Sequence, residues 1–232
     1  MAADPDLLAT LSGAQLEVIG RLPNSSNATL LVRLCGTDLR GVYKPLQGER
    51  PLWDFEPGLY LHEVAAFRVS EELGWDLVPP TVVCDGPHGE GSLQLFVDFD
   101  PREHYFTLLE SRTDVHDTLR KMAVFDIVAN NTDRKGGHVL LGLDGNVWGI
   151  DHGVCFSPDF KLRTVIWDFA GDEIDDQVLA PLERWLEAVP ASVREVLTDD
   201  ETDAMCERIG WLVENRVLPA PSSRYEYPWP IL

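Results

Sequence analysis

NTDRKGGH occupies residues 131–138, GIDHG occupies residues 149–153, and VLLGLDGNVW lies between them. Residues 139–143 and 146–150 are predicted to be two strands, because Asp144-Gly145 is a typical tight hairpin turn. A hairpin folds its two ends together. Asp133 and Asp151 stand just outside these ends and are therefore expected to converge.

Two convergent carboxylates suit phosphoryl transfer. One can accept or orient the proton of the nucleophile, and the other can hold the divalent ion that bridges the phosphates. Each segment alone also has a structural reading: Asn-Thr-Asp at residues 131–133 is a common turn or cap sequence, and Ile-Asp-His-Gly at residues 150–153 can be a strand end. The two readings stay open on these residues alone.

The chain before this segment is rich in predicted strands. Apolar segments at residues 15–22 and 29–34 are separated by turn-forming residues, and a third strand follows at residues 41–45. Helical spacing of apolar residues predicts a helix over residues 58–73, closed by Gly74. The last two strands are expected at residues 78–84 and 92–97. Together they predict a five-stranded, mainly antiparallel sheet with one inserted helix.

The chain after residue 99 changes character. One helix is expected to start at Thr113 or Asp114 and run through Ile127, with further helices at residues 177–189 and about 200–213. A Pro-rich tail covers residues 219–232. We therefore expect an α+β, two-lobed, single domain over residues 1–232. Its β-rich N-lobe covers about residues 12–98, its helical C-lobe about residues 99–218, and a ligand lies in the cleft between them.

Composition excludes several classes of protein. With 232 residues, of which 44% are hydrophobic, the chain can bury a real core. Neither a secretion signal nor a membrane span is indicated, so the expected location is cytoplasmic. A net charge of -20, from 19 Lys+Arg and 39 Asp+Glu, makes nucleic acid and anionic membranes poor partners. The four cysteines have no metal or disulfide spacing.

Lys44 and Glu63 form a second candidate pair. Lys44 stands among apolar residues of a predicted strand and needs an anionic partner, and Glu63 lies on the following predicted helix. Alone, this pair is as much a structural ion pair as a clamp for phosphate.

These motifs occur in the order of a known family. The chain resembles the phosphatidylinositol 3/4-kinase superfamily, and is most similar to the type II phosphatidylinositol 4-kinases, over about residues 20–167. The matching segments are NSSNAT at residues 24–29, YKP at 43–45, Glu63 on its helix, LVPPT at 77–81, SLQLFV at 92–97, VFDI at 124–127, NTDR at 131–134 and IDHGVCF at 150–156.

The resemblance implies a protein-kinase-like fold that binds ATP. The loop Ser25-Ser26-Asn27 would cover the phosphates through backbone N–H groups, and Lys44, held by Glu63, would contact the α- and β-phosphates. Gln94 to Val97 would form the hinge, with backbone groups near Phe96 and Val97 meeting the adenine edge.

The resemblance also implies roles near the hairpin. Asp133 would be the catalytic aspartate and Asp151 the metal-binding one. Arg134 and Lys135 would either stabilise the transferring phosphate or order the loop, and both readings stay open.

The chain departs from the family at His138, where the family has an Asn as second metal ligand. Imidazole nitrogen suits Mn²⁺ better than Mg²⁺, so the metal preference between these two ions is open. An imidazole with its ordinary pKa of about 6.5 would also make a Mn²⁺-supported rate drop below neutral pH.

A second departure from the family concerns the molecule that accepts the phosphate. Residues 47–57 hold no Cys and only Arg50 as a basic residue, so the lipid-anchoring signals of the type II lipid kinases are missing and no stable membrane anchoring is expected. The sequence therefore predicts an ATP-dependent kinase that phosphorylates a hydroxyl of a soluble acceptor, either an inositol-type small molecule or a protein. The alternatives are a catalytically weak nucleotide-binding regulator, a phosphoinositide lipid kinase, and transfer of the nucleotide moiety.

Overall fold

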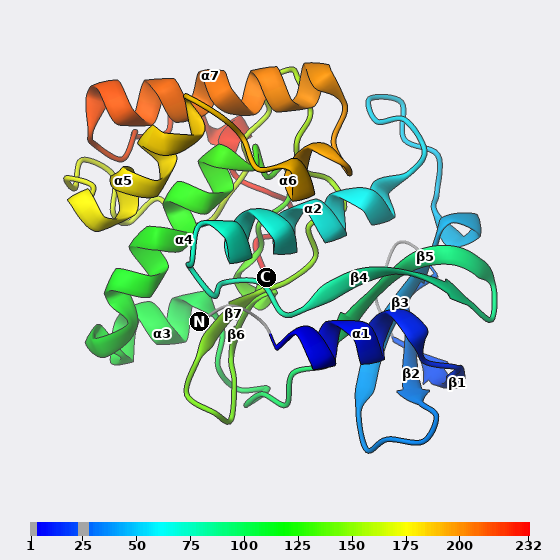
Figure 1. Ribbon diagram of the computed structural model, residues 1–232. Helices are drawn as coiled ribbons and strands as arrows, with labels where there is room; N and C mark the ends of the chain where they lie inside the picture. Colours follow the sequence, from blue (N-terminus) through cyan, green and yellow to red (C-terminus); the bar gives the residue numbers. More distant parts are fainter. Residues whose placement is uncertain (1–3, 23–27) are drawn as a thin grey trace.

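Five antiparallel strands form the sheet of the first lobe in the computed structural model, which describes residues 4–22 and 28–232 (Figure 1). The strand order is β1-β2-β3-β5-β4. The strands are β1 Leu16–Arg21, β2 Leu30–Leu34, β3 Arg40–Pro45, β4 Thr81–Gly86 and β5 Gly89–Leu95. The predicted five-stranded antiparallel sheet is confirmed.

Helix α1 (Pro5–Gly13) packs on this sheet and was not expected from the sequence. Its start carries ordinary helix signals: the Asp4 carboxylate accepts the N–H of Asp6 at 3.0 Å, and Pro5 occupies the first turn. Leu11 is fully buried in the same hydrophobic cluster as Tyr43 and Leu93. The helix therefore closes the small core of the sheet.

Strand β3, which carries Lys44, lies very close to β5. Lys44 is paired with Ser92 of β5, and the next pair is Pro45 with Gly91. A Cβ at residue 91 would overlap the carbonyl oxygen of Lys44, so only glycine fits this register.

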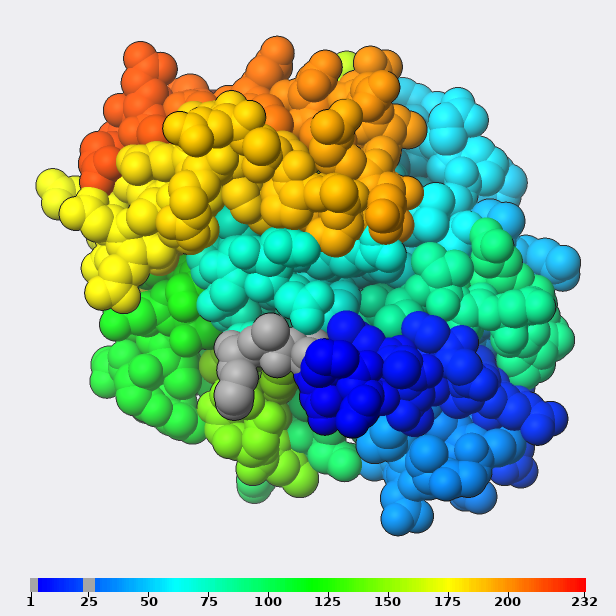
Figure 2. Space-filling model, in the orientation of Figure 1, coloured from blue at the N-terminus to red at the C-terminus, as the bar shows by residue number. Residues whose placement is uncertain are grey.

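Helix α2 (Leu59–Glu72) links the sheet to the second lobe, in agreement with the predicted helix. Gly74 follows it with φ of 67°, a conformation that glycine adopts without strain. Val64 and Phe67 of α2 are buried in the larger hydrophobic core, together with residues of the second lobe. The Arg68 guanidinium also donates to the Glu195 carboxylate at 3.0 Å. Figure 2 shows α2 (cyan) as a surface band beside α6 and α7 (orange).

The second lobe is helical, as expected. Its elements are α3 Tyr105–Ser111, α4 His116–Val128, hairpin strands β6 Val139–Leu141 and β7 Val147–Gly149, α5 Asp176–Trp185, α6 Ala191–Arg194 and α7 Asp199–Asn215. Short α3 and α6 were not predicted. Helix α4 begins at His116, because residues 113–115 form a 3-10 turn, and α5 ends at Trp185.

The sheet-bearing first lobe and the helical second lobe confirm the predicted α+β fold class. Within the described ranges, no helix combines the length and apolar character that a membrane crossing needs.

Candidate active site

Three charged side chains from three elements meet where the lobes join. The Lys44 ammonium of β3 donates to the Glu63 carboxylate of α2, and also to Oδ1 of Asp151 at 2.8 Å. The side chain of Glu63 is only 3% exposed, whereas that of Asp151 is 52% exposed. The Lys44–Glu63 pair expected from the sequence is therefore present, and its exposed side is closed by Asp151.

The loop that follows β7 is tied to α2. The second carboxylate oxygen of Glu63 accepts the backbone N–H of His152 at 3.0 Å. One residue earlier on α2, the His62 Nδ1 atom lies 3.1 Å from the Gly153 carbonyl oxygen, while its Nε2 atom lies 2.8 Å from Glu201. These contacts fix the position of Asp151 relative to Lys44.

Electrostatics keep the pair of Lys44 and Asp151 charged. The positive charge of Lys44 holds the pKa of Asp151 well below its usual range. Burial alone would lower the pKa of Lys44, but the carboxylates of Asp151 and Glu63 outweigh burial and raise it. The backbone of Asp151 has φ of 63°, a left-handed conformation that aspartate tolerates better than most residues.

His138 lies beside the other oxygen of Asp151. Its Nε2 atom is 3.5 Å from Oδ2 of Asp151. Burial lowers the pKa of His138 to about 4, although the charge of Asp151 opposes this shift. The protonation expected just below neutral pH therefore moves to about pH 4, and the imidazole is neutral at physiological pH.

A divalent ion fits this arrangement only with help from other ligands. In the part of the chain that the structure describes, no group of three or more His, Cys, Asp or Glu side chains could hold a metal. Asp151 offers an exposed carboxylate, with a neutral imidazole beside it. The carboxylate alone suits an ion such as Mg²⁺ that keeps several waters and is otherwise bound by substrate phosphates, whereas a contribution from the imidazole suits Mn²⁺ better.

Asp133 lies in the loop after α4. Its carboxylate accepts from the Lys135 ammonium at 2.7 Å, and its side chain is 33% exposed. Burial raises the pKa of Asp133; the negative charge of Asp151 adds to this effect, whereas Lys135 and Arg163 oppose it. The carboxylate of Asp133 is therefore more basic than usual, mainly because of burial and partly because of the charge of Asp151.

Arg134 occupies the core of the second lobe. Its side chain is 0% exposed and pairs with the equally buried Asp126 of α4 at 2.9 Å. Further N–H groups donate to the Ile150 carbonyl at 3.0 Å and to Nε2 of His152 at 2.6 Å. A guanidinium committed in this way cannot also face a phosphate. Of the two readings of Arg134, this placement favours ordering of the loop.

Asp126 and Asn131 also hold the loop of Asp133, although no role was predicted for them from the sequence. Asp126 binds Arg134 and also accepts the Thr164 hydroxyl at 2.9 Å. The Asn131 side-chain carbonyl accepts the Asp133 N–H at 3.0 Å, and its amide donates to Asp126 at 3.1 Å. The sequence did contain a signal for the role of Asp126. This acid lies on the apolar face of a predicted helix, and a buried charge needs a partner.

The expected hinge joins the lobes. The Gln94 side-chain amide donates to the Thr81 hydroxyl at 3.0 Å and is buried, so it supports the sheet. The N–H of Phe96 donates to the Arg40 carbonyl at 2.9 Å. The N–H of Val97 has no hydrogen-bond partner among residues 4–22 and 28–232. Ser25, Ser26 and Asn27 lie outside the described residues.

The fold of the chain is kinase-like. The model of the family "Phosphatidylinositol 3- and 4-kinase" matches residues 82–197. The chain belongs to this family, and the resemblance seen in the sequence is confirmed.

Three curated relatives are similar to the chain, and two of them have phosphatidylinositol 4-kinase names. "Protein Rv2133c" of Mycobacterium tuberculosis is 40% identical over 99% of this chain and 97% of that protein. "Phosphatidylinositol 4-kinase gamma 4" of Oryza sativa is 30% identical over 52% of this chain, but only 22% of the rice protein. The Arabidopsis thaliana protein of the same name is 29% identical over 57% of this chain and 31% of its own length.

Two solved structures share the fold. The Helicobacter pylori proinflammatory kinase CtkA has a TM-score of 0.52 at 10% identity, covering 90% of this chain and 94% of that chain. Hydra Fam20 with sugar has a TM-score of 0.56 at 15% identity, covering 90% and 87%.

Proposed function

We propose that the chain transfers the γ-phosphate of ATP to a hydroxyl of a soluble acceptor. The observation that carries this proposal is the contact of Lys44 with both Glu63 and Asp151 where the two lobes meet, next to the loop of Asp133. In a kinase, such a lysine holds phosphates and such carboxylates serve the metal and the nucleophile.

The chemistry assigned to these residues is a single displacement. The acceptor hydroxyl gives its proton to the Asp133 carboxylate, and its oxygen forms the new bond to the γ-phosphorus. The bond from the γ-phosphorus to the bridging oxygen breaks, and ADP leaves. The raised pKa of Asp133 favours its role as base. A divalent ion held by Asp151 and His138 would supply positive charge to the phosphate oxygens.

ATP itself is the proposed nucleotide. The unpaired N–H of Val97 would donate to the adenine edge, and Lys44 would move from Asp151 toward the α- and β-phosphates while Glu63 retains it. Lys135 would guide the transferring phosphate, because its ammonium already lies at Asp133.

The test of the proposal compares ATP binding with ATP turnover. The chain is incubated with ATP, Mg²⁺ or Mn²⁺, and a panel of small polyols and candidate proteins, and products are analysed by mass spectrometry. A gain of one phosphate on a hydroxyl supports the proposal. ATP binding without turnover or autophosphorylation supports a nucleotide-binding regulator instead, and a nucleotide on the product supports nucleotide transfer.

Lys44→Ala is expected to weaken ATP binding, and Glu63→Ala is expected to weaken it less. Lys44 would contact phosphate directly, whereas Glu63 acts by holding Lys44. Calorimetry with ATP and Mg²⁺ measures both affinities. Arg33→Ala, which breaks an exposed pair with Glu17 at 3.7 Å in the same sheet, is the matched control and should leave affinity unchanged. Equal affinity in Lys44→Ala and the control would contradict the assignment of Lys44.

His138→Asn is expected to shift metal preference from Mn²⁺ toward Mg²⁺. Nitrogen ligation costs the harder Mg²⁺ more, so Mn²⁺ should support turnover of the unmodified protein at least as well as Mg²⁺. Because the pKa of His138 is about 4, its protonation removes a ligand only near that pH. Rates with both ions are measured from pH 8 down to pH 5.

Over that range His138→Asn should keep the shape of the pH profile and change only the ratio of the two metal-supported rates. An unchanged ratio would mean that His138 only supports the loop, through the contact between its Nδ1 atom and the Lys135 N–H.

A further inference from the structure

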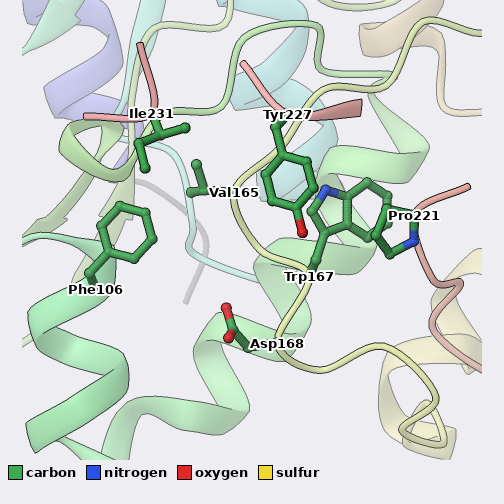
Figure 3. Close-up of a pocket in the computed structure, with 7 residues that line it drawn as sticks. All are labelled: Phe106, Val165, Trp167, Asp168, Pro221, Tyr227 and Ile231. Atoms are coloured by element: carbon green, nitrogen blue, oxygen red, sulfur yellow. The ribbon is translucent and has the colours of Figure 1, made fainter. Parts of the chain in front are cut away.

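A cavity of about 290 Å³ lies in the second lobe, and Lys44, Glu63 and Asp151 are not among the residues that line it (Figure 3). One wall comes from α3, a second from the segment after the Asp151 loop, and a third from the C-terminal tail. The lining residues are Phe106, Val165, Trp167, Asp168, Pro221, Tyr227 and Ile231. Its volume is near the lower end of small-molecule sites.

The cavity adjoins the loop of Asp133. The N–H of Val165 donates to the Arg134 carbonyl at 3.1 Å, and the N–H of Gly136 donates to the Ile231 carbonyl at 2.8 Å. A Cβ at Gly136 would lie 2.8 Å from the Phe106 ring. Residues one and three positions after Asp133 therefore touch the cavity walls, which places the cavity beside the loop that carries the proposed base.

The walls are held in place by defined contacts. The Trp167 indole N–H donates to the Glu226 carbonyl at 3.2 Å, and the Thr164 N–H donates to the same oxygen at 3.0 Å. On the opposite side, the Tyr105 hydroxyl donates to Oδ2 of Asp168 at 2.7 Å. The tail is thus part of the cavity and positions the ring of Tyr227.

The lining favours positive charge. Phe106, Trp167 and Tyr227 contribute aromatic rings, Asp168 contributes a carboxylate, and none of the lining residues is basic. The Trp167 and Tyr227 ring centroids are 6.5 Å apart at a tilt of 58°. Figure 3 shows Phe106 on one side of the cavity and Trp167 and Tyr227 on the other, with Asp168 between them at one end. Ring faces and a carboxylate together attract an organic cation, and they disfavour phosphate.

We propose that this cavity binds a small molecule that carries an ammonium group, and that this molecule is the acceptor, with its hydroxyl directed toward Asp133. The assignment of this molecule as the acceptor rests on the proposed function, whereas the binding of an ammonium group in the cavity does not. The carboxylate of Asp168 would face the ammonium, while Trp167 and Tyr227 would contact its carbon substituents.

Calorimetry without nucleotide tests the binding site. The probes are choline, which has a quaternary ammonium and a hydroxyl, and dimethylbutanol, its uncharged isostere. Choline should bind at least about tenfold more tightly than dimethylbutanol, because only the cation interacts with the rings and the carboxylate. Asp168→Asn retains an acceptor for the Tyr105 hydroxyl, and should weaken choline binding about tenfold and leave dimethylbutanol unchanged.

Asp38→Asn is the matched control, because it removes the same charge from an exposed turn of the first lobe. It should leave both affinities unchanged. Tyr227→Leu removes one ring face from a half-exposed residue and should weaken choline alone. Equal binding of choline and its isostere, no choline binding by a folded protein, or equal effects of Asp168→Asn and Asp38→Asn would each overturn the cation site.

Phosphate transfer is measured separately, with ATP and a series of amino alcohols. Transfer that is lost in Asp168→Asn, while ATP affinity persists, supports the cavity as the acceptor site. Choline binding without transfer to any amino alcohol overturns the acceptor assignment and leaves the cation site standing. Transfer to neutral polyols that is unchanged in Asp168→Asn overturns the acceptor assignment while supporting the proposed kinase activity.

Discussion

Asp151→Asn and Asp133→Asn are each expected to lower phosphotransfer by about two to four orders of magnitude. Asp133→Asn removes the carboxylate that would accept the proton of the nucleophile. Asp151→Asn removes the anion that would hold the metal and that contacts Lys44 at 2.8 Å. Single-turnover assays with a confirmed acceptor measure both effects.

Measurements of ATP binding are expected to distinguish the roles of Asp133 and Asp151. Only Asp151→Asn should also weaken metal-dependent ATP binding, since Asp133 would face the acceptor and not the ion. Asp117→Asn is a matched control, because its side chain is 100% exposed on the surface of α4. A rate like that of the unmodified protein in either active-site variant, with the same acceptor, would remove the mechanism.

Pairs of charges in apolar surroundings were the most predictable part of this site. Lys44 in a strand and Glu63 on a helix each needed a partner, and the order of the motifs made them partners of one another. The hairpin between Asp133 and Asp151 was equally predictable, because Asp144-Gly145 is a typical tight turn between two apolar segments. Their catalytic roles stay predictions.

Tertiary packing decided what the sequence could not show. Helix α1 is short, and its burial depends on a sheet whose edge it covers. The tail at residues 219–232 has no period. Its position follows from single contacts, such as Gly136 N–H to Ile231 and Trp167 to Glu226. Long-range contacts of this kind leave no local pattern, so the cavity that they complete was not predicted.

Arg134 shows why residue type alone is ambiguous. An arginine next to a catalytic aspartate can contact phosphate or hold the backbone, and both uses exploit the same planar donors. Full burial and the pairing with Asp126 favour the second use. The guanidinium of Arg134 connects α4 and the loop of Asp133 to the loop of Asp151. These bonds hold the two loops, and therefore the two aspartates, in fixed positions relative to one another.

Arg134→Ala is expected to lower the free energy of unfolding by about 3–5 kcal/mol, because it leaves the Asp126 charge buried and unpaired. It also removes the donors to the Ile150 carbonyl and to His152. Urea denaturation followed by circular dichroism measures the change. Arg120→Ala breaks partly exposed pairs with Asp172 and Asp117 and a contact over the Phe169 ring, and should cost only about 1–2 kcal/mol.

Asp126→Ala alone should cost a similar amount, because Arg134 is then the unpaired charge. The double variant Asp126→Ala with Arg134→Ala should be less destabilised than the sum of the single variants, since neither charge is left buried without the other. Additive losses would mean that the two side chains act independently. A loss in Arg134→Ala no larger than that in Arg120→Ala would show that the guanidinium is solvated, and the loop-ordering role would then be wrong.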